Sequence, residues 1–160
     1  MVTLKASSGD VHVMYACLRM GRGESIVDNA SAGGILCSID ISTGEATFGV
    51  DELGHCYECH PDSGKRICGF KIPRWEECVR FVKELATVVD DLCYGSWDVA
   101  LTKSGWCMVE GNINGQFIWQ YPLRRGCRTE LGQWFMKYGS PDVADKVTAL
   151  LGKVRTRRGE

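Results

Sequence analysis

The sequence predicts an α+β fold in which antiparallel β-hairpins form a sheet covered by helices. Three observations predict it: short β-forming runs alternate with turn residues, one long pattern of helical period follows, and two shorter helical patterns end the chain. The 160 residues, 44% hydrophobic and 24% charged, have the composition of an ordinary globular domain. No linker-like stretch divides the chain, so these elements are expected to pack in shared layers.

Three β-hairpins are predicted where apolar and β-branched runs flank turn residues such as Ser8-Gly9-Asp10. They pair residues 1–6 with 11–20, 33–41 with 45–51, and 97–102 with 106–110. A further short strand is expected at residues 67–72, after a polar stretch at 55–65.

The strongest helical pattern begins after Pro73, a residue favoured at the first position of a helix. Apolar side chains recur there at i, i+3, i+4 and i+7 from Trp75 to Leu92, with charged residues between them. Two further amphipathic stretches are expected at about 130–138 and at 141–151. The segment 113–129 between them is expected to be a loop with aromatic anchors.

Composition excludes several classes of protein. The 19 Lys and Arg balance 20 Asp and Glu, which argues against a dedicated nucleic-acid binder. No apolar run approaches the ~20 residues of a membrane-spanning helix, and the first residues lack a signal-peptide core. Nine cysteines, an odd number, then favour reduced thiols in a cytoplasmic chain over a disulfide framework.

The segment 55–60 contains Cys56, Cys59, His55 and His60, and Cys56 to His60 has the Cys-x-x-Cys-His spacing of covalent haem attachment. Thiolates and imidazoles are also the ligands of zinc. Structural zinc sites usually combine two separated ligand pairs, and no second Cys-x-x-Cys is present. Along a strand, Cys56 and Cys59 would also point to opposite faces. An inert hairpin edge is therefore the favoured interpretation.

Three oxygen-bearing side chains are expected to converge at the end of the third hairpin. Glu110 and Asn112 are two residues apart on one strand and so share a face. The tight turn at 103–105 would bring Asp98 to their level. Two carboxylates and an amide oxygen suit Mg²⁺, which typically holds the phosphates of a nucleotide. The alternative is a polar strand end without a metal.

The small-residue loop at 28–34 precedes a strand and contains Asn29, Gly33 and Gly34, with Arg19 upstream. Adjacent glycines let backbone N–H groups approach an anion, and an arginine can bind a phosphoryl or carboxylate oxygen. Taken alone, a Gly-Gly loop is more often a plain turn.

Four runs in this order, together, resemble the C-terminal half of an ATP-grasp enzyme. They are residues 18–21, 27–34, 97–100 and 109–112. The chain is most similar to the sugar-transfer-associated ATP-grasp branch, close to the α-L-glutamate ligase-like proteins. Segments 60–64 and 69–73 also resemble that branch, and the resemblance covers roughly residues 2–125.

The resemblance implies roles for the residues already singled out. Asp98, Glu110 and Asn112 would bind Mg²⁺, with Glu110 bridging two ions. Arg19 would contact the terminal phosphate of ATP or an acyl phosphate. Asn29 would take part in catalysis, and Gly33, Gly34 and Met108 would bind ATP or phosphate. Met108 lies two residues before Glu110 and is therefore expected to share its face. The implied reaction activates a small carboxylate as an acyl phosphate, which an amine then attacks to form an amide.

The resemblance also implies a domain organisation. Residues 1–140 would be the C-terminal ATP-grasp subdomain, and residues 141–160 a helix with a basic tail. The N-terminal subdomain, which holds adenine, would be missing, so the isolated chain is expected to self-associate, to bind ATP weakly and to be inactive alone. The alternative function is a non-catalytic module, either a small metal-binding domain that uses the Cys and His side chains of segment 55–60 or a remnant that contacts a partner.

Overall fold

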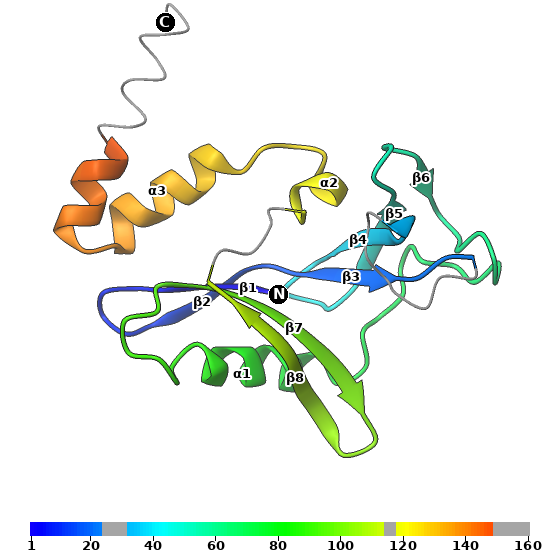
Figure 1. Cartoon of the computed structure of the whole chain (residues 1–160), viewed down its shortest axis with the longest axis horizontal. Helices are drawn as coiled ribbons and strands as arrows, with labels where there is room; N and C mark the ends of the chain where they lie inside the picture. The colour runs from blue at the N-terminus through cyan, green and yellow to red at the C-terminus, as the bar shows by residue number, and fades with distance from the viewer. Residues whose placement is uncertain (24–31, 114–117, 149–160) are drawn as a thin grey trace, which may run out of the picture.

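The computed structural model describes residues 1–23, 32–113 and 118–148. It contains two four-stranded antiparallel sheets with helices packed against them, which confirms the α+β class (Figure 1). The strands are β1 (Val2–Lys5), β2 (Val11–Tyr15), β3 (Cys17–Met20), β4 (Ile35–Ile39), β5 (Ala46–Val50), β6 (Cys56–Tyr57), β7 (Tyr94–Thr102) and β8 (Gly105–Asn112). The helices are α1 (Trp75–Leu85), α2 (Gln120–Leu123) and α3 (Arg128–Tyr138), and residues 141–148 are also helical.

The first sheet has the order β2-β1-β7-β8, and its two faces are covered by different helices. One face packs on α1, where Trp97 meets Val82 and Ala86. The Trp97 indole N–H also donates a hydrogen bond to Thr3 Oγ1 at 2.7 Å, so this buried contact joins β7 to β1. In Figure 1, α1 lies on one side of this sheet and α3 on the other.

The opposite face of the first sheet carries the apolar residues that contact the C-terminal helices. Val2 packs there with Tyr15 and Trp119, and Leu4 packs with Trp134 of α3. Val2 is the direct cross-strand partner of Ser96. The same face therefore continues into β7 with Ser96 and, two residues later, Asp98.

The second sheet has the order β3-β4-β5-β6 and is built around the predicted hairpin at 33–51. Its core lies on one face, with Ile35, Cys37 and Ile39 of β4 against Ala46 of β5 and Ile67. Helix α2 contacts β4 and β5, so the C-terminal segment packs on both sheets.

The predicted strand at 11–20 is two strands in two sheets. β2 pairs with β1 as far as the Val2–Tyr15 pair, where β1 ends. After the buried Ala16, the chain pairs with β4 instead, beginning with Cys17 opposite Ser38. The single predicted strand is wrong because β1 is too short to serve as a partner beyond Tyr15.

Helix α1 ends at Leu85, whereas the apolar pattern predicts a helix to Leu92. The β-branched run from Thr87 to Val89 has low helix propensity. The backbone carbonyls of Val89 and Asp90 both accept hydrogen bonds from Lys5 Nζ, at 2.8 and 2.6 Å. Val88 and Val89 are exposed, so the apolar pattern in this stretch does not report burial.

Other boundaries also differ from the predictions. The segment 67–72 is a turn rather than a strand, since the Phe70 N–H bonds to the Ile67 carbonyl and Lys71 makes an isolated bridge to Glu45. The loop predicted at 113–129 contains α2, and α3 begins two residues before the expected position. The third hairpin is longer than predicted. Residues 149–151 of the last predicted helix lie outside the described residues.

Gly44 lies in the turn between β4 and β5 and supports the first residue of α1. Its φ is 72°, and a Cβ atom there would overlap the ring of Trp75. The Trp75 indole N–H holds this contact by donating to the Ile41 carbonyl at 2.8 Å. The turn and the start of α1 therefore leave no room for a side chain.

We expect Gly44→Ala to lower the free energy of unfolding by about 3 kcal/mol, because it adds left-handed strain to overpacking. Gly54→Ala is the matched control: Gly54 has a φ of 86° and nothing within 4 Å of its Cβ position. This control should lose only about 1–2 kcal/mol. Urea unfolding of both variants measures the difference, and equal losses would contradict the steric argument.

Candidate functional site

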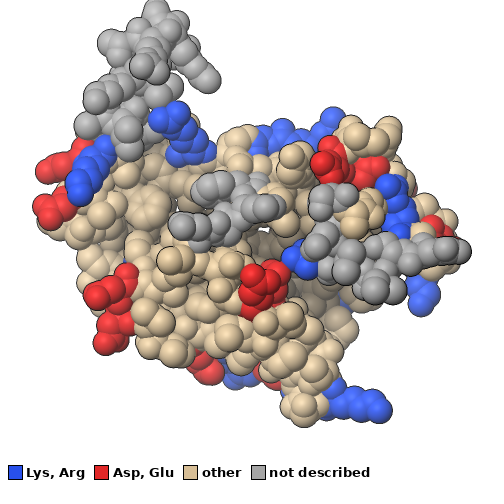
Figure 2. Space-filling model, viewed as in Figure 1, with Lys and Arg blue, Asp and Glu red and all other residues tan. Residues whose placement is uncertain are grey.

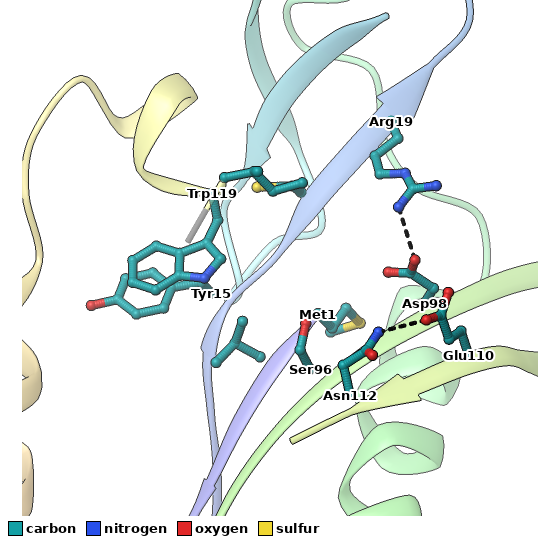
Figure 3. Close-up of a pocket in the computed structure, with 11 residues that line it drawn as sticks. Met1, Tyr15, Arg19, Ser96, Asp98, Glu110, Asn112 and Trp119 are labelled. Carbon is teal, nitrogen blue, oxygen red and sulfur yellow. Dashed lines mark hydrogen bonds and ion pairs between the residues drawn. The ribbon is translucent and has the colours of Figure 1, made fainter. Parts of the chain in front are cut away.

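A pocket of about 380 Å³ lies where the first sheet meets the beginning of the second. Its volume falls within the range of small-molecule sites. The polar residues that line it come from three strands of the two sheets: Arg19 from β3, Ser96 and Asp98 from β7, and Glu110 and Asn112 from β8 (Figure 3). The structure therefore brings together four of the residues singled out in the sequence.

The β7–β8 hairpin places the acidic side chains opposite each other. Asp98 is the direct cross-strand partner of Glu110, and Ser96 is the partner of Asn112. The Asn112 amide N–H₂ donates a hydrogen bond to Glu110 Oε1 at 3.0 Å. Because cross-strand partners share a face, all three oxygen-bearing side chains lie on the pocket side of the sheet.

Arg19 reaches this group from the second sheet. Its guanidinium Nη1 lies 2.8 Å from Asp98 Oδ2, and both side chains are about one-third exposed. Figure 2 shows a small acidic group near the middle of this face with a basic side chain beside it. The ion pair thus joins the two sheets and offsets part of the repulsion between Asp98 and Glu110.

The donor set fits Mg²⁺ in its chemistry. Among bonds between described residues, Asp98 uses only Oδ2 and Glu110 only Oε1, so each carboxylate has a second oxygen for a ligand. Asn112 adds an amide oxygen, and hard oxygen donors are those that Mg²⁺ prefers. Over the described ranges, no cluster of three or more His, Cys, Asp or Glu side chains is placed to hold a metal. A metal here would therefore depend on two carboxylates, the amide oxygen and groups from a bound ligand.

Met108 does not line this pocket. The sequence predicts that it shares the face of Glu110, but this prediction is wrong because β8 contains a β-bulge. Asp98 pairs with Glu110, whereas the next residue, Val99, pairs with Met108. Neighbouring strand residues point to opposite faces, so Met108 lies on the Val99 side, away from the pocket.

Gly33 and Gly34 are not among the described residues that line the pocket. Gly33 and Gly34 precede β4, beside the end of β3, where Met20 pairs with Ile35. A Cβ atom on Gly33 would lie 3.6 Å from the Arg22 guanidinium, not beside Arg19. Asn29 lies outside the described residues.

Sequence reasoning missed the apolar wall of the pocket. Tyr15 and Trp119 stack with ring centroids 3.9 Å apart and an interplanar angle of 9°, and both are almost fully buried. Cys17 also lines the pocket, and burial raises the pKa of its thiol to about 12. At neutral pH this thiol is therefore protonated and is not a nucleophile. In the sequence, only the expected aromatic anchors of segment 113–129 point to Trp119.

The Cys- and His-containing segment is held by hydrogen bonds. The buried Asp51 carboxylate accepts bonds from His55 Nδ1 at 3.0 Å and from the Tyr57 hydroxyl at 2.9 Å. Burial alone would raise the pKa of Asp51, but these bonds bring it well below its usual range. His60 Nε2 donates to the Gly21 carbonyl at 2.8 Å. Both imidazoles thus have structural partners.

The two cysteines of this segment are exposed, and the Cys56 thiol lies 3.5 Å from the Arg124 guanidinium. Neither cysteine belongs to a metal-binding cluster within the part of the chain that the structure describes. The same part contains no helix long and apolar enough to cross a membrane.

Comparison with known proteins gives one result. A model of the family described as sugar-transfer associated ATP-grasp matches residues 1–133. No curated protein and no solved structure matches the chain. The family match includes every described residue that lines the pocket.

Proposed function

The chain belongs to the sugar-transfer-associated ATP-grasp family, and from this premise we propose that its pocket is the magnesium and phosphate end of a carboxylate–amine ligase site. The family generally binds ATP and Mg²⁺, which gives the chain an ATP-binding, ligase-like function. The finer proposal is that ATP activates a carboxylate as an acyl phosphate and that an amine then displaces the phosphate to form an amide.

The proposed roles follow from the charges of the residues. Asp98, Glu110 and Asn112 would hold Mg²⁺, which neutralises phosphate charge when bound. Arg19 would donate hydrogen bonds to the terminal phosphate and to the acyl phosphate formed from it. Phosphoryl transfer needs positioning and charge neutralisation rather than a protein nucleophile, which agrees with the protonated state of Cys17.

One observation carries the proposal: a cationic and two anionic side chains from separate sheets converge on one pocket together with Asn112. Arg19 is 79 residues from Asp98 in the sequence, yet the two side chains are in contact. The pairing of acidic donors with a nearby guanidinium suits a ligand that combines a metal ion with phosphates.

Isothermal titration calorimetry tests the proposal directly. We expect saturable binding of ATP in the presence of Mg²⁺ and at least tenfold weaker binding in EDTA, because the two carboxylates repel a metal-free triphosphate. AMP with Mg²⁺ is the matched ligand control, since it lacks the β- and γ-phosphates. Equal binding of ATP with and without Mg²⁺ would contradict the assignment of Asp98 and Glu110.

A further inference from the structure

The pocket has two chemically different ends. Arg19, Asp98 and Glu110 lie at one end, and the apolar side chains of Tyr15, Ile118 and Trp119 form the other. Figure 3 shows Tyr15 and Trp119 on the opposite side of the pocket from Arg19 and Asp98, with Ser96 between them. A ligand that spans the pocket must therefore be polar at one end and apolar at the other.

The apolar end is closely packed against the core. The stacked rings of Tyr15 and Trp119 pack with Val2 and Cys127 in one buried core cluster. Leu123 of α2 and Leu131 of α3 lie against this cluster. Such a preformed surface presents a fixed shape, so little conformational entropy is lost when a ligand packs on it.

The charges fix the orientation of a ligand. Arg19 is the one side-chain cation among the described residues of the pocket wall, and the Met1 amino group there already donates to the Trp97 carbonyl at 2.6 Å. A carboxylate is therefore bound near Arg19, or near a metal held by Asp98 and Glu110. The apolar end offers no charged partner, and burial keeps the Cys17 thiol neutral. A second charge at that end would be desolvated without compensation.

We infer that the carboxylate substrate is a small monocarboxylic acid with an apolar aliphatic or aromatic body. Its carboxylate lies at the Arg19 end, and its body packs against Tyr15, Ile118 and Trp119. This inference rests on the proposed function for the identity of the site, and it adds the class of acid that the site selects. The volume of about 380 Å³ suits such a small acid.

Saturation-transfer NMR without nucleotide tests the inference separately from ATP chemistry. The probes are acetate, butyrate and pentanoate, with glutarate as the counterpart of pentanoate that ends in a second carboxylate. Affinity should rise up to about fourfold for each added CH₂ that is buried. Glutarate should bind at least about tenfold more weakly than pentanoate, because its second charge would be buried unpaired.

Two isoleucines provide a matched pair of variants. Ile118 is half-buried and lines the apolar end, whereas Ile113 is 67% exposed and lies outside the pocket. We expect Ile118→Glu to abolish the rise in affinity with chain length, and Ile113→Glu to leave it unchanged. The inference would be overturned if the wild-type chain bound acetate, butyrate and pentanoate with equal affinity, or bound glutarate as tightly as pentanoate. Either result would count regardless of whether ATP binds. Absence of Mg²⁺-dependent ATP binding alongside the expected acid series would instead overturn the proposed function alone.

Discussion

Glu110→Gln is expected to lower the affinity for ATP with Mg²⁺ by at least about 100-fold, equivalent to about 2.8 kcal/mol. Glutamine has nearly the same size, and its carbonyl oxygen can still accept the hydrogen bond that Asn112 gives to Glu110 Oε1. The variant therefore removes one negative charge while it leaves the shape of the site intact. Calorimetric titration with ATP at fixed Mg²⁺ measures the loss.

The matched control for this experiment is Glu52→Gln, because Glu52 is an exposed carboxylate that does not line the pocket. It should leave the affinity within about twofold of the wild-type value, since an exposed charge outside the site is strongly screened. Asp98→Asn should resemble Glu110→Gln. Retention of Mg²⁺-dependent ATP binding in both pocket variants would show that the metal is held elsewhere.

Arg19→Gln is expected to move two affinities in opposite directions. In the present structure the guanidinium already neutralises Asp98, with 2.8 Å between Nη1 and Oδ2. Removing this competing cation should raise the affinity for a divalent ion alone by about threefold, as expected for an ion pair whose side chains are about one-third exposed. The affinity for ATP with Mg²⁺ should instead fall at least about tenfold, because a charge-assisted hydrogen bond to phosphate is lost.

Titration with Mn²⁺, followed by electron paramagnetic resonance, measures the first affinity, and calorimetry with ATP measures the second. Arg74→Gln is the control, because Arg74 forms an exposed ion pair with Glu77 and does not line the pocket. If Arg19→Gln weakened Mn²⁺ binding, the arginine would be orienting Asp98 for the metal rather than competing with it.

Much of the fold could be predicted because its signals are local. Turn residues between two β-forming runs predict each hairpin, and apolar residues at helical spacing after Pro73 predict α1. The break at Ala16 could not be predicted, because side chains alternate in the same way whichever sheet provides the next partner. After the early end of α1, the Val89 carbonyl accepts a hydrogen bond from Lys5, which lies 84 residues away and which no local pattern reveals.

The candidate site, like the fold, could be predicted from the sequence only in part. A three-residue turn at 103–105 predicts the Asp98–Glu110 pair, but Thr102 pairs with Gly105, and that turn alone would set Asp98 opposite Val109. The β-bulge shifts the register by one residue and so makes the pair. Met108 could not be placed correctly, because the bulge that reverses its face leaves no signature in residue types. Tyr15 and Trp119 meet only through the packing of the C-terminal segment on both sheets. Their place in the pocket wall depends on tertiary packing, and the spacing of apolar residues in the sequence does not predict that packing.

The position of β1 between β2 and β7 has a consequence for the order of folding. β1 and β2 are joined by a short turn, but Thr3 and Trp97, which bond across β1 and β7, are 94 residues apart. Closing so long a loop costs conformational entropy before any contact repays it, whereas the local hairpins can form early. We therefore expect the strand that carries Asp98 to join the sheet late, after the intervening hairpins and α1 have shortened the effective loop. A partly folded chain would keep much of its secondary structure while Arg19 and Asp98 remained apart, so ligand binding reports completion of the fold.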